Sequence, residues 1–141
     1  MPRFATTVEI ARPPQDVFAF LTDLAKLPQW QSSLAGARAE EPLRVGTRIR
    51  ERRKFMGREL NTQVEVTTYD PPHHFDLESR GGPLSFEIRH LLQPAGDGTR
   101  LEVEVEFKLG AMAGLAARPL LKPAEREFRS DFERLKRVLE G

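Results

Sequence analysis

Residues Leu101-Glu102-Val103-Glu104-Val105-Glu106-Phe107 alternate apolar and acidic side chains without interruption. This period of two is typical of a strand with one buried and one solvated face. Residues 111–140 follow, with apolar side chains close to one helical stripe at Leu121, Phe128, Phe132, Leu135 and Leu139. An amphipathic helix beside an amphipathic strand buries its stripe against the sheet. The pair predicts an α+β domain in which a curved antiparallel sheet grips a long C-terminal helix.

Upstream of this strand, two kinds of pattern fill the chain. Six segments read as strands separated by turn residues: 3–10, 37–41, 47–55, 60–68, 75–77 and 86–92. After the first of these, Pro13-Pro14 predicts a helix start before residues 16–21, and residues 23–30 predict a second short helix that Pro28 ends or interrupts. Pro119 and Pro123 predict that the final helix is kinked or preceded by a separate short helix.

Composition favours a globular protein and excludes several chemistries. The 141 residues suit one domain, 1–141, with 39% hydrophobic and 30% charged side chains and a net charge of +1. The chain has no cysteine, which excludes disulfides and thiolate chemistry. Residues 1–10 alternate rather than forming an apolar signal segment, and no apolar run is long enough to span a membrane. We expect a cytoplasmic protein.

The chain resembles the START-like, helix-grip superfamily often called SRPBCC, in its polyketide cyclase/dehydrase and lipid-transport branch. The resemblance covers essentially the whole chain and is carried by residues 10–18, 21–30, 45–47, 69–72, 94–99 and 135–140. It implies a seven-stranded sheet bent around the last helix, with two short helices between strands one and two. It brings no shared catalytic motif, so catalytic residues stay unassigned.

The resemblance and the pattern together predict binding, or carriage, of a small hydrophobic, aromatic or lipid-like molecule in a cavity between sheet and helix. The first alternative is a metal-free cyclase or dehydratase that uses a few polar cavity groups. The second is a protein-interaction module with a vestigial cavity. We expect no cofactor, no nucleic acid and a monomer or homodimer. Residues 110–117 predict a gate, a surface that touches a membrane during ligand exchange, or an ordinary Ala-rich helix start packed on the sheet rim.

Polar residues on inward strand phases are the candidate ligand contacts. His90 lies on the same strand face as the apolar residues Phe86 and Ile88. Its candidate roles there are a contact to a ligand, acid or base catalysis, and a hydrogen bond to a neighbouring strand. Glu51 and Arg53 share the inward phase of residues 47–55, which predicts a polar spot in a partly wetted cavity. The alternative is a bulge after Glu51 that moves one of them outside.

Apolar residues on the same phases are the candidate cavity lining: Ile49, Phe86, Ile88, Phe107 and Met112. Trp30 either packs the short helices onto the sheet or lines the entrance. His73 and His74 point to opposite sides of an extended segment, so we expect no metal site. Seven basic residues and one acid lie between Arg44 and Arg58, and their alternation without an aromatic platform indicates a solvated face rather than nucleic-acid binding.

Overall fold

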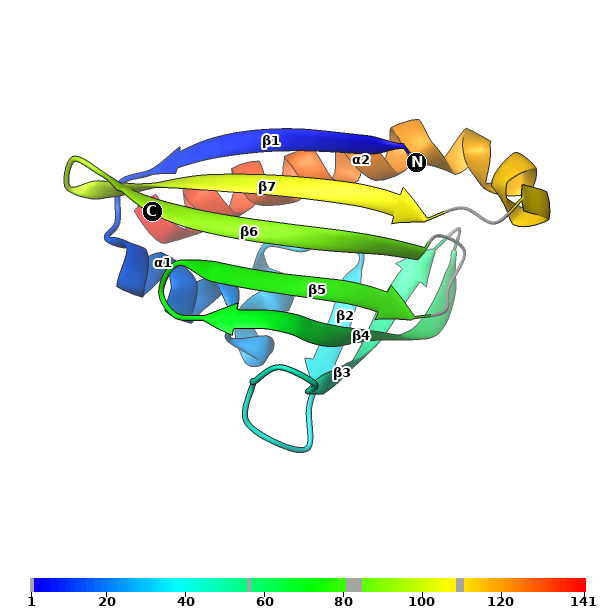
Figure 1. Ribbon diagram of the computed structural model, residues 1–141, viewed down its shortest axis with the longest axis horizontal. Helices are drawn as coiled ribbons and strands as arrows, with labels where there is room; N and C mark the ends of the chain where they lie inside the picture. Colours follow the sequence, from blue (N-terminus) through cyan, green and yellow to red (C-terminus); the bar gives the residue numbers. More distant parts are fainter. Residues whose placement is uncertain (1, 56, 81–84, 109–110) are drawn as a thin grey trace.

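The computed structural model describes residues 2–55, 57–80, 85–108 and 111–141, and the side chains of Phe55, Arg80 and residues 111–117 lie outside the described set. The strands are β1 (Arg3–Ile10), β2 (Leu34–Arg38), β3 (Arg48–Phe55), β4 (Arg58–Asp70), β5 (His74–Arg80), β6 (Ser85–Ala95) and β7 (Gly98–Lys108). They form one antiparallel sheet in the order β1-β7-β6-β5-β4-β3-β2. In Figure 1 the β2–β3 end turns away from the plane of β5–β7, so the sheet is curved.

Helices complete the fold in the described part of the chain. The α-helix α1 (Pro14–Leu21) and the 3₁₀ helix η1 (Leu24–Gln29) lie between β1 and β2, and α2 (Ala111–Glu140) follows β7. Pro14 begins α1, where its missing N–H is not needed, and Asp23 caps η1 by accepting a hydrogen bond from the Ala25 amide at 3.2 Å. The architecture is the helix-grip fold that the sequence predicts.

The apolar stripe of α2 lies against the inner face of the sheet (Figure 1). The Phe128 ring lies 5.8 Å from Phe4 on β1 and 5.4 Å from Phe86 on β6. Phe132 and Leu135, one and two turns further along, are buried at 2% and 0% exposure. The helix stays in place because its stripe removes a large apolar area of both layers from water.

The C-terminal end of α2 is tied to the segment after β1 by polar contacts. The Ala11 amide donates to Glu140 Oε2 at 2.8 Å, and Arg12 Nε donates to the Leu139 carbonyl at 2.8 Å. Lys136 Nζ reaches the Glu9 carbonyl at 2.6 Å. These contacts fix the C-terminal end of the helix along β1. Residues between Leu120 and Phe132 face the inner side of the sheet, and the first turns of α2 extend past the ends of β1 and β7 (Figure 1).

The structure corrects or leaves untested some local details of the predicted elements. The second strand is Leu34–Arg38 rather than 37–41, because its pairing with β3 begins at Leu34 and shifts register before Gly36. The helix α2 runs through Pro119 and Pro123, so neither proline splits off a separate short helix. The expected turns at Met56 and at residues 81–83 lie outside the described residues.

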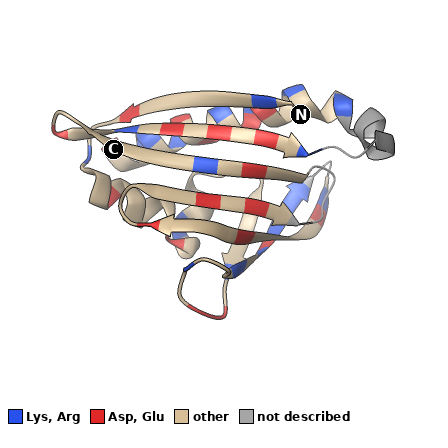
Figure 2. Ribbon diagram, in the orientation of Figure 1, with Lys and Arg blue, Asp and Glu red and all other residues tan. Residues whose placement is uncertain are grey.

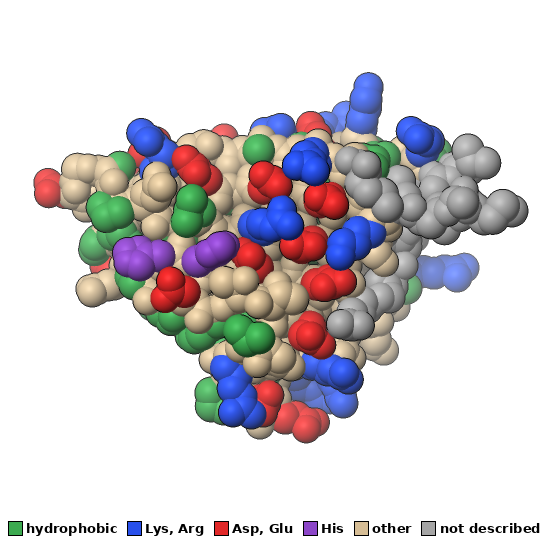
Figure 3. Space-filling model, in the orientation of Figure 1, with side chains coloured by type: hydrophobic (Ala, Val, Ile, Leu, Met, Phe, Trp, Pro, Cys, Tyr) green, Lys and Arg blue, Asp and Glu red, His purple; other side chains and the backbone are tan. Residues whose placement is uncertain are grey.

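The outer face of the sheet is charged, as the alternation predicts. Figure 2 shows acidic and basic residues along the strands, and Figure 3 shows them intermixed on the face that α2 does not cover. Arg89 on β6 pairs with Glu104 on β7 at 2.9 Å and with Glu87 at 2.7 Å. Such exposed pairs stabilise little individually, so this face is a solvated surface.

Candidate functional site

A cavity of about 250 Å³ lies between the inner face of the sheet, the short helices and α2. The short helices contribute Leu21, Leu24 and Leu27, and strands β3 to β7 contribute inward side chains such as Ile49, Val64 and Phe107. The helix α2 contributes residues from Leu120 to Phe132. The sheet curves away from α2 at this point, so side chains from the two layers do not fill the space between them.

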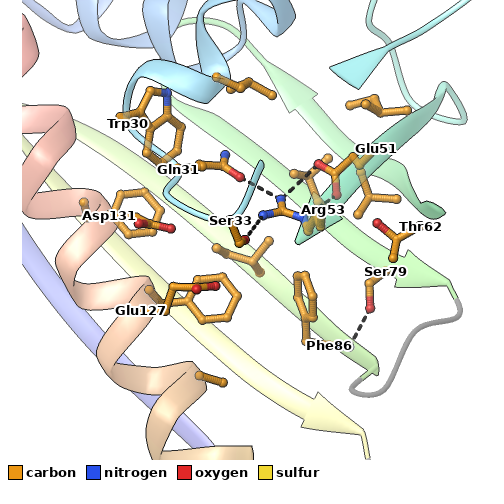
Figure 4. Close-up of a pocket in the computed structure, with 18 of the residues that line it drawn as sticks. Trp30, Gln31, Ser33, Glu51, Arg53, Thr62, Ser79, Phe86, Glu127 and Asp131 are labelled. Atoms are coloured by element: carbon orange, nitrogen blue, oxygen red, sulfur yellow. Dashed lines mark hydrogen bonds and ion pairs between the residues drawn. The ribbon is translucent and has the colours of Figure 1, made fainter. Parts of the chain in front are cut away.

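Glu51 and Arg53 form a polar cluster with Gln31 and Ser33 in the cavity wall. The Arg53 guanidinium donates to Glu51 Oε1 from Nε at 3.0 Å, to Ser33 Oγ at 3.0 Å and to Gln31 Oε1 at 2.7 Å (Figure 4). The β3–β4 register is continuous from Arg48 to Phe55, so no bulge follows Glu51. Both charged side chains therefore face inward and neutralise each other there.

Apolar side chains line much of the rest of the cavity wall. Ile49, Ile88 and Phe107 are at most 4% exposed, and half-buried Phe86 lies beside Phe128 of α2. All four sheet residues are among those expected from the strand alternation, and all four contribute to the wall. Met112 belongs to the side chains outside the described set.

His90 lies in the wall with its ring held by a neighbouring strand. Its Nδ1 donates to the Phe75 carbonyl at 2.7 Å, which fixes the tautomer with Nε2 unprotonated. The ring stacks on Phe75 at 5.5 Å and contacts Phe132 at 5.6 Å. Burial lowers the pKa of His90 to about 4, so the imidazole is neutral at physiological pH. The interstrand hydrogen bond gives this residue a structural role.

Trp30 packs on the helix α2 and also contributes to the cavity wall. Its ring packs on Phe132 at 5.3 Å and is 2% exposed, which joins the short helices to α2, and the side chain also forms part of the cavity wall. Its indole nitrogen has no hydrogen-bond partner among the described residues. The Thr62 hydroxyl, across the cavity on β4, is also buried without a partner in that part of the chain.

The sequence reasoning missed two acids on α2 that point into the cavity, Asp131 and Glu127 (Figure 4). Asp131 is 5% exposed and accepts a hydrogen bond from the Ser32 amide at 3.1 Å. Burial raises the pKa of Asp131 to about 6, and the nearby Glu127 carboxylate adds to the rise against the opposing hydrogen bonds from Ser32 and the charge of Arg134. Asp131 is therefore a cavity group whose protonation changes near neutral pH.

A signal for Asp131 was present in the sequence. It lies three residues after Phe128 and four before Leu135, which places it beside the apolar stripe of the helix. An acid at such a position is expected to be desolvated. Gln31 and Ser33 gave no comparable signal, because only the tertiary fold brings them to Arg53. Thr62 shares the strand face of Leu60 and Val64, so the alternation of residues 60–68 placed it inward.

Comparison with known protein families gives a match over nearly the whole chain. A family model described as polyketide cyclase / dehydrase and lipid transport matches residues 1–140. Two uncharacterised proteins from Mycobacterium tuberculosis strains CDC 1551 and H37Rv are each 28% identical over 124 residues, which cover 86% of this chain and 84% of theirs. No helix among the described residues is long and apolar enough to cross a membrane.

Solved structures share the fold at low sequence identity. The protein TTHA0849 from Thermus thermophilus has a TM-score of 0.78 and 20% identity, with 98% of this chain and 97% of that chain covered. Ara h 8.0201 has a TM-score of 0.73 and 13% identity, covering 98% and 97%. The di-domain ARO/CYC BexL from the BE-7585A biosynthetic pathway has a TM-score of 0.78 and 15% identity, covering 97% of this chain and 46% of that chain.

Proposed function

This chain belongs to the polyketide cyclase / dehydrase and lipid transport family, and from that premise we propose that it binds a small apolar or aromatic molecule between the sheet and α2. The observation that carries the proposal is the cavity of about 250 Å³, whose wall combines aliphatic and aromatic side chains with the Arg53 cluster. Protein sites for small molecules are typically concave and mainly apolar, with a few placed polar groups.

The cavity size favours a compact ligand. A volume of about 250 Å³ is just below the usual range of roughly 300–1,000 Å³ for small-molecule sites. A molecule of two or three fused rings, or a short acyl chain, suits that space better than a long-chain lipid. The phenyl rings of Phe86, Phe107 and Phe128 would provide aromatic edges and faces for such a ring system.

Buried polar groups without partners in the cavity wall favour a ligand with at least one hydrogen-bonding substituent. The Thr62 hydroxyl and the Trp30 indole N–H are buried in the wall without partners among the described residues. A buried polar group without a partner destabilises the protein by about 1–3 kcal/mol. A carbonyl or hydroxyl group on the ligand would supply the missing hydrogen bond and would orient the ring system in the cavity.

Native mass spectrometry of protein purified from its own host tests this proposal through any ligand that co-purifies. In parallel, 1-aminoanthracene, an uncharged three-ring dye, should bind saturably with enhanced fluorescence. Ile88→Trp, which fills the cavity, should weaken dye binding. The matched control is Val45→Trp, because Val45 is 63% exposed and lies away from the cavity wall. Non-saturating fluorescence, or equal loss in both variants, would refute cavity binding.

One observation favours a second candidate function, acid–base catalysis on the bound molecule. Asp131 points into the cavity with its pKa raised to about 6, close to the value that suits a general acid or base near neutral pH. A cyclisation or dehydration of a carbonyl compound needs such proton transfers. The apolar lining would hold the reacting chain and Asp131 would exchange the proton.

Catalysis is distinguished from simple binding by testing whether the protein converts the bound molecule into a product. Once a co-purified ligand is identified, its precursors or analogues are incubated with the protein and with Asp131→Asn, and the products are compared by mass. Conversion by the protein with loss of conversion, but retained binding, in the variant supports catalysis. Because a cyclisation can conserve mass, the samples are also separated by chromatography. Unchanged mass and unchanged retention time in both samples leave binding as the function.

A further inference from the structure

The outer face of β2, β3 and β4 carries a shallow hollow of about 830 Å³, on the opposite side of the sheet from the cavity. Because neighbours alternate between the two faces of a strand, the inward Glu51 and Thr62 place the adjacent residues outside. The side chains that reach the hollow from this outer face are Arg38, Arg50, Arg52, Asn61 and Gln63. All five carry hydrogen-bond donors and none carries a negative charge. Figure 2 shows the basic residues along β3 in blue. We refer to these five side chains as the arginine face.

Like charges lie directly opposite one another in the arginine face. Arg38 on β2 is the register partner of Arg50 on β3. Within the described part of the chain neither guanidinium has an ion pair or a hydrogen bond, whereas Arg52 pairs with Glu59 at 3.6 Å. Like charges at directly opposite positions of an antiparallel pair destabilise the sheet. Two uncompensated positive charges therefore lie side by side on the face.

The Arg52 side chain occupies the space over Gly36 in the hollow. A Cβ atom at Gly36 would lie 2.8 Å from Nη2 of Arg52, so the guanidinium lies over the glycine backbone. On the other side of β3, the amides of Asn61 and Gln63 are the register partners of Arg52 and Arg50. The donors thus form two neighbouring rows across the strands: one contains Arg38, Arg50 and Gln63, and the other contains Arg52 and Asn61.

We propose that the arginine face binds a small phosphate-bearing molecule. A phosphomonoester carries a charge of about −1.5 to −2 at neutral pH, which matches the two unpaired guanidiniums. Its three free oxygens accept more of the available N–H groups than the two oxygens of a carboxylate, and guanidinium forks bind such oxygens in pairs. No aromatic side chain lines the hollow among the described residues, so the face lacks the stacking platform that single-stranded nucleic acid needs.

The probe for this site is inorganic phosphate, titrated into the ¹⁵N-labelled protein and followed by NMR, with chloride at equal ionic strength as the reference anion. We expect saturable shifts in the amides of β2, β3 and β4. Arg50→Gln and Arg38→Gln should each weaken binding by about tenfold, the loss of one charge-assisted hydrogen-bonding group. Arg126→Gln is the matched control, because Arg126 is an exposed residue of α2 without an ion pair in the described part of the chain.

The thermal midpoint gives a second readout. At one phosphate concentration, phosphate should raise the melting temperature of the protein and of Arg126→Gln by the same amount, and that of Arg50→Gln by less. Sedimentation with phosphatidic acid vesicles distinguishes the sources of the phosphate: binding that soluble phosphate displaces indicates a lipid head group, and no sedimentation indicates a free phosphorylated molecule. Phosphate shifts no larger than those with chloride, or equal weakening by Arg126→Gln and Arg50→Gln, would overturn the proposal and leave an ordinary solvated face.

Discussion

Asp131→Asn tests the electrostatics of the cavity through the pH dependence of stability. The folded pKa of Asp131 is about 6, against 3.8 for the unperturbed carboxyl group. Because the folded pKa is raised, the folded state favours the protonated form. The associated stability is complete below pH 3.8 and is lost as the pH rises through 6. The difference of about 2 units corresponds to roughly 3 kcal/mol at about 1.36 kcal/mol per unit.

His90 makes the stability of the fold depend on pH in nearly the same range as Asp131, but in the opposite direction. Its folded pKa is lowered from 6.5 to about 4, so the folded state favours the neutral ring. Stability from this group is complete above pH 6.5 and is lost as the pH falls toward 4, by about 3 kcal/mol. In the unaltered protein the two contributions therefore oppose each other between about pH 4 and 6.5.

The assay is urea unfolding at several pH values for the protein, Asp131→Asn and His90→Gln. Relative to the protein, Asp131→Asn should be about 3 kcal/mol more stable at pH 7 and equally stable near pH 4, because the asparagine Oδ1 still accepts the Ser32 hydrogen bond. His90→Gln should instead gain relative stability at acid pH. A stability difference for Asp131→Asn that does not change with pH would refute the desolvation argument.

Three further changes test the fold and the polar cluster. Phe132→Ala should lower the free energy of unfolding by about 3–5 kcal/mol, because the ring is 2% exposed between Trp30 and the sheet. An unchanged denaturation midpoint would mean that α2 does not pack on the sheet through this residue. Glu51→Gln should destabilise by about 1–3 kcal/mol because it leaves the Arg53 charge uncompensated in the wall, and the double variant with Arg53→Gln should recover part of that loss in a thermodynamic cycle. Thr62→Val should leave the ligand-free protein equally stable or more stable, since it removes an unpaired buried hydroxyl. Hydroxylated aromatic ligands should displace the bound dye less well from this variant. A less stable Thr62→Val would show that this hydroxyl has a structural partner.

Much of the fold was readable from the sequence because strand and helix periodicities report which side chains are buried. The alternation of residues 101–107 and the stripe through Phe128 and Phe132 correctly placed the last strand and the last helix against each other. The same alternation placed Ile49 and Ile88 on the inner face. The boundary of β2 was misplaced because a five-residue edge strand with a register shift carries too little pattern to locate.

The sequence by itself determined which residues face inward, since that depends only on the local period of two or 3.6. Only the tertiary structure decided which inward groups meet. Arg53 reaches Gln31 and Ser33, twenty-two and twenty residues away, and Asp131 reaches Ser32 across ninety-nine residues. The pKa of Asp131 depends on such encounters, because desolvation and hydrogen bonding arise from three-dimensional surroundings that local periodicity does not encode. Glu51 and Arg53, by contrast, are two residues apart on one strand, so the local period of two already places them on the same face.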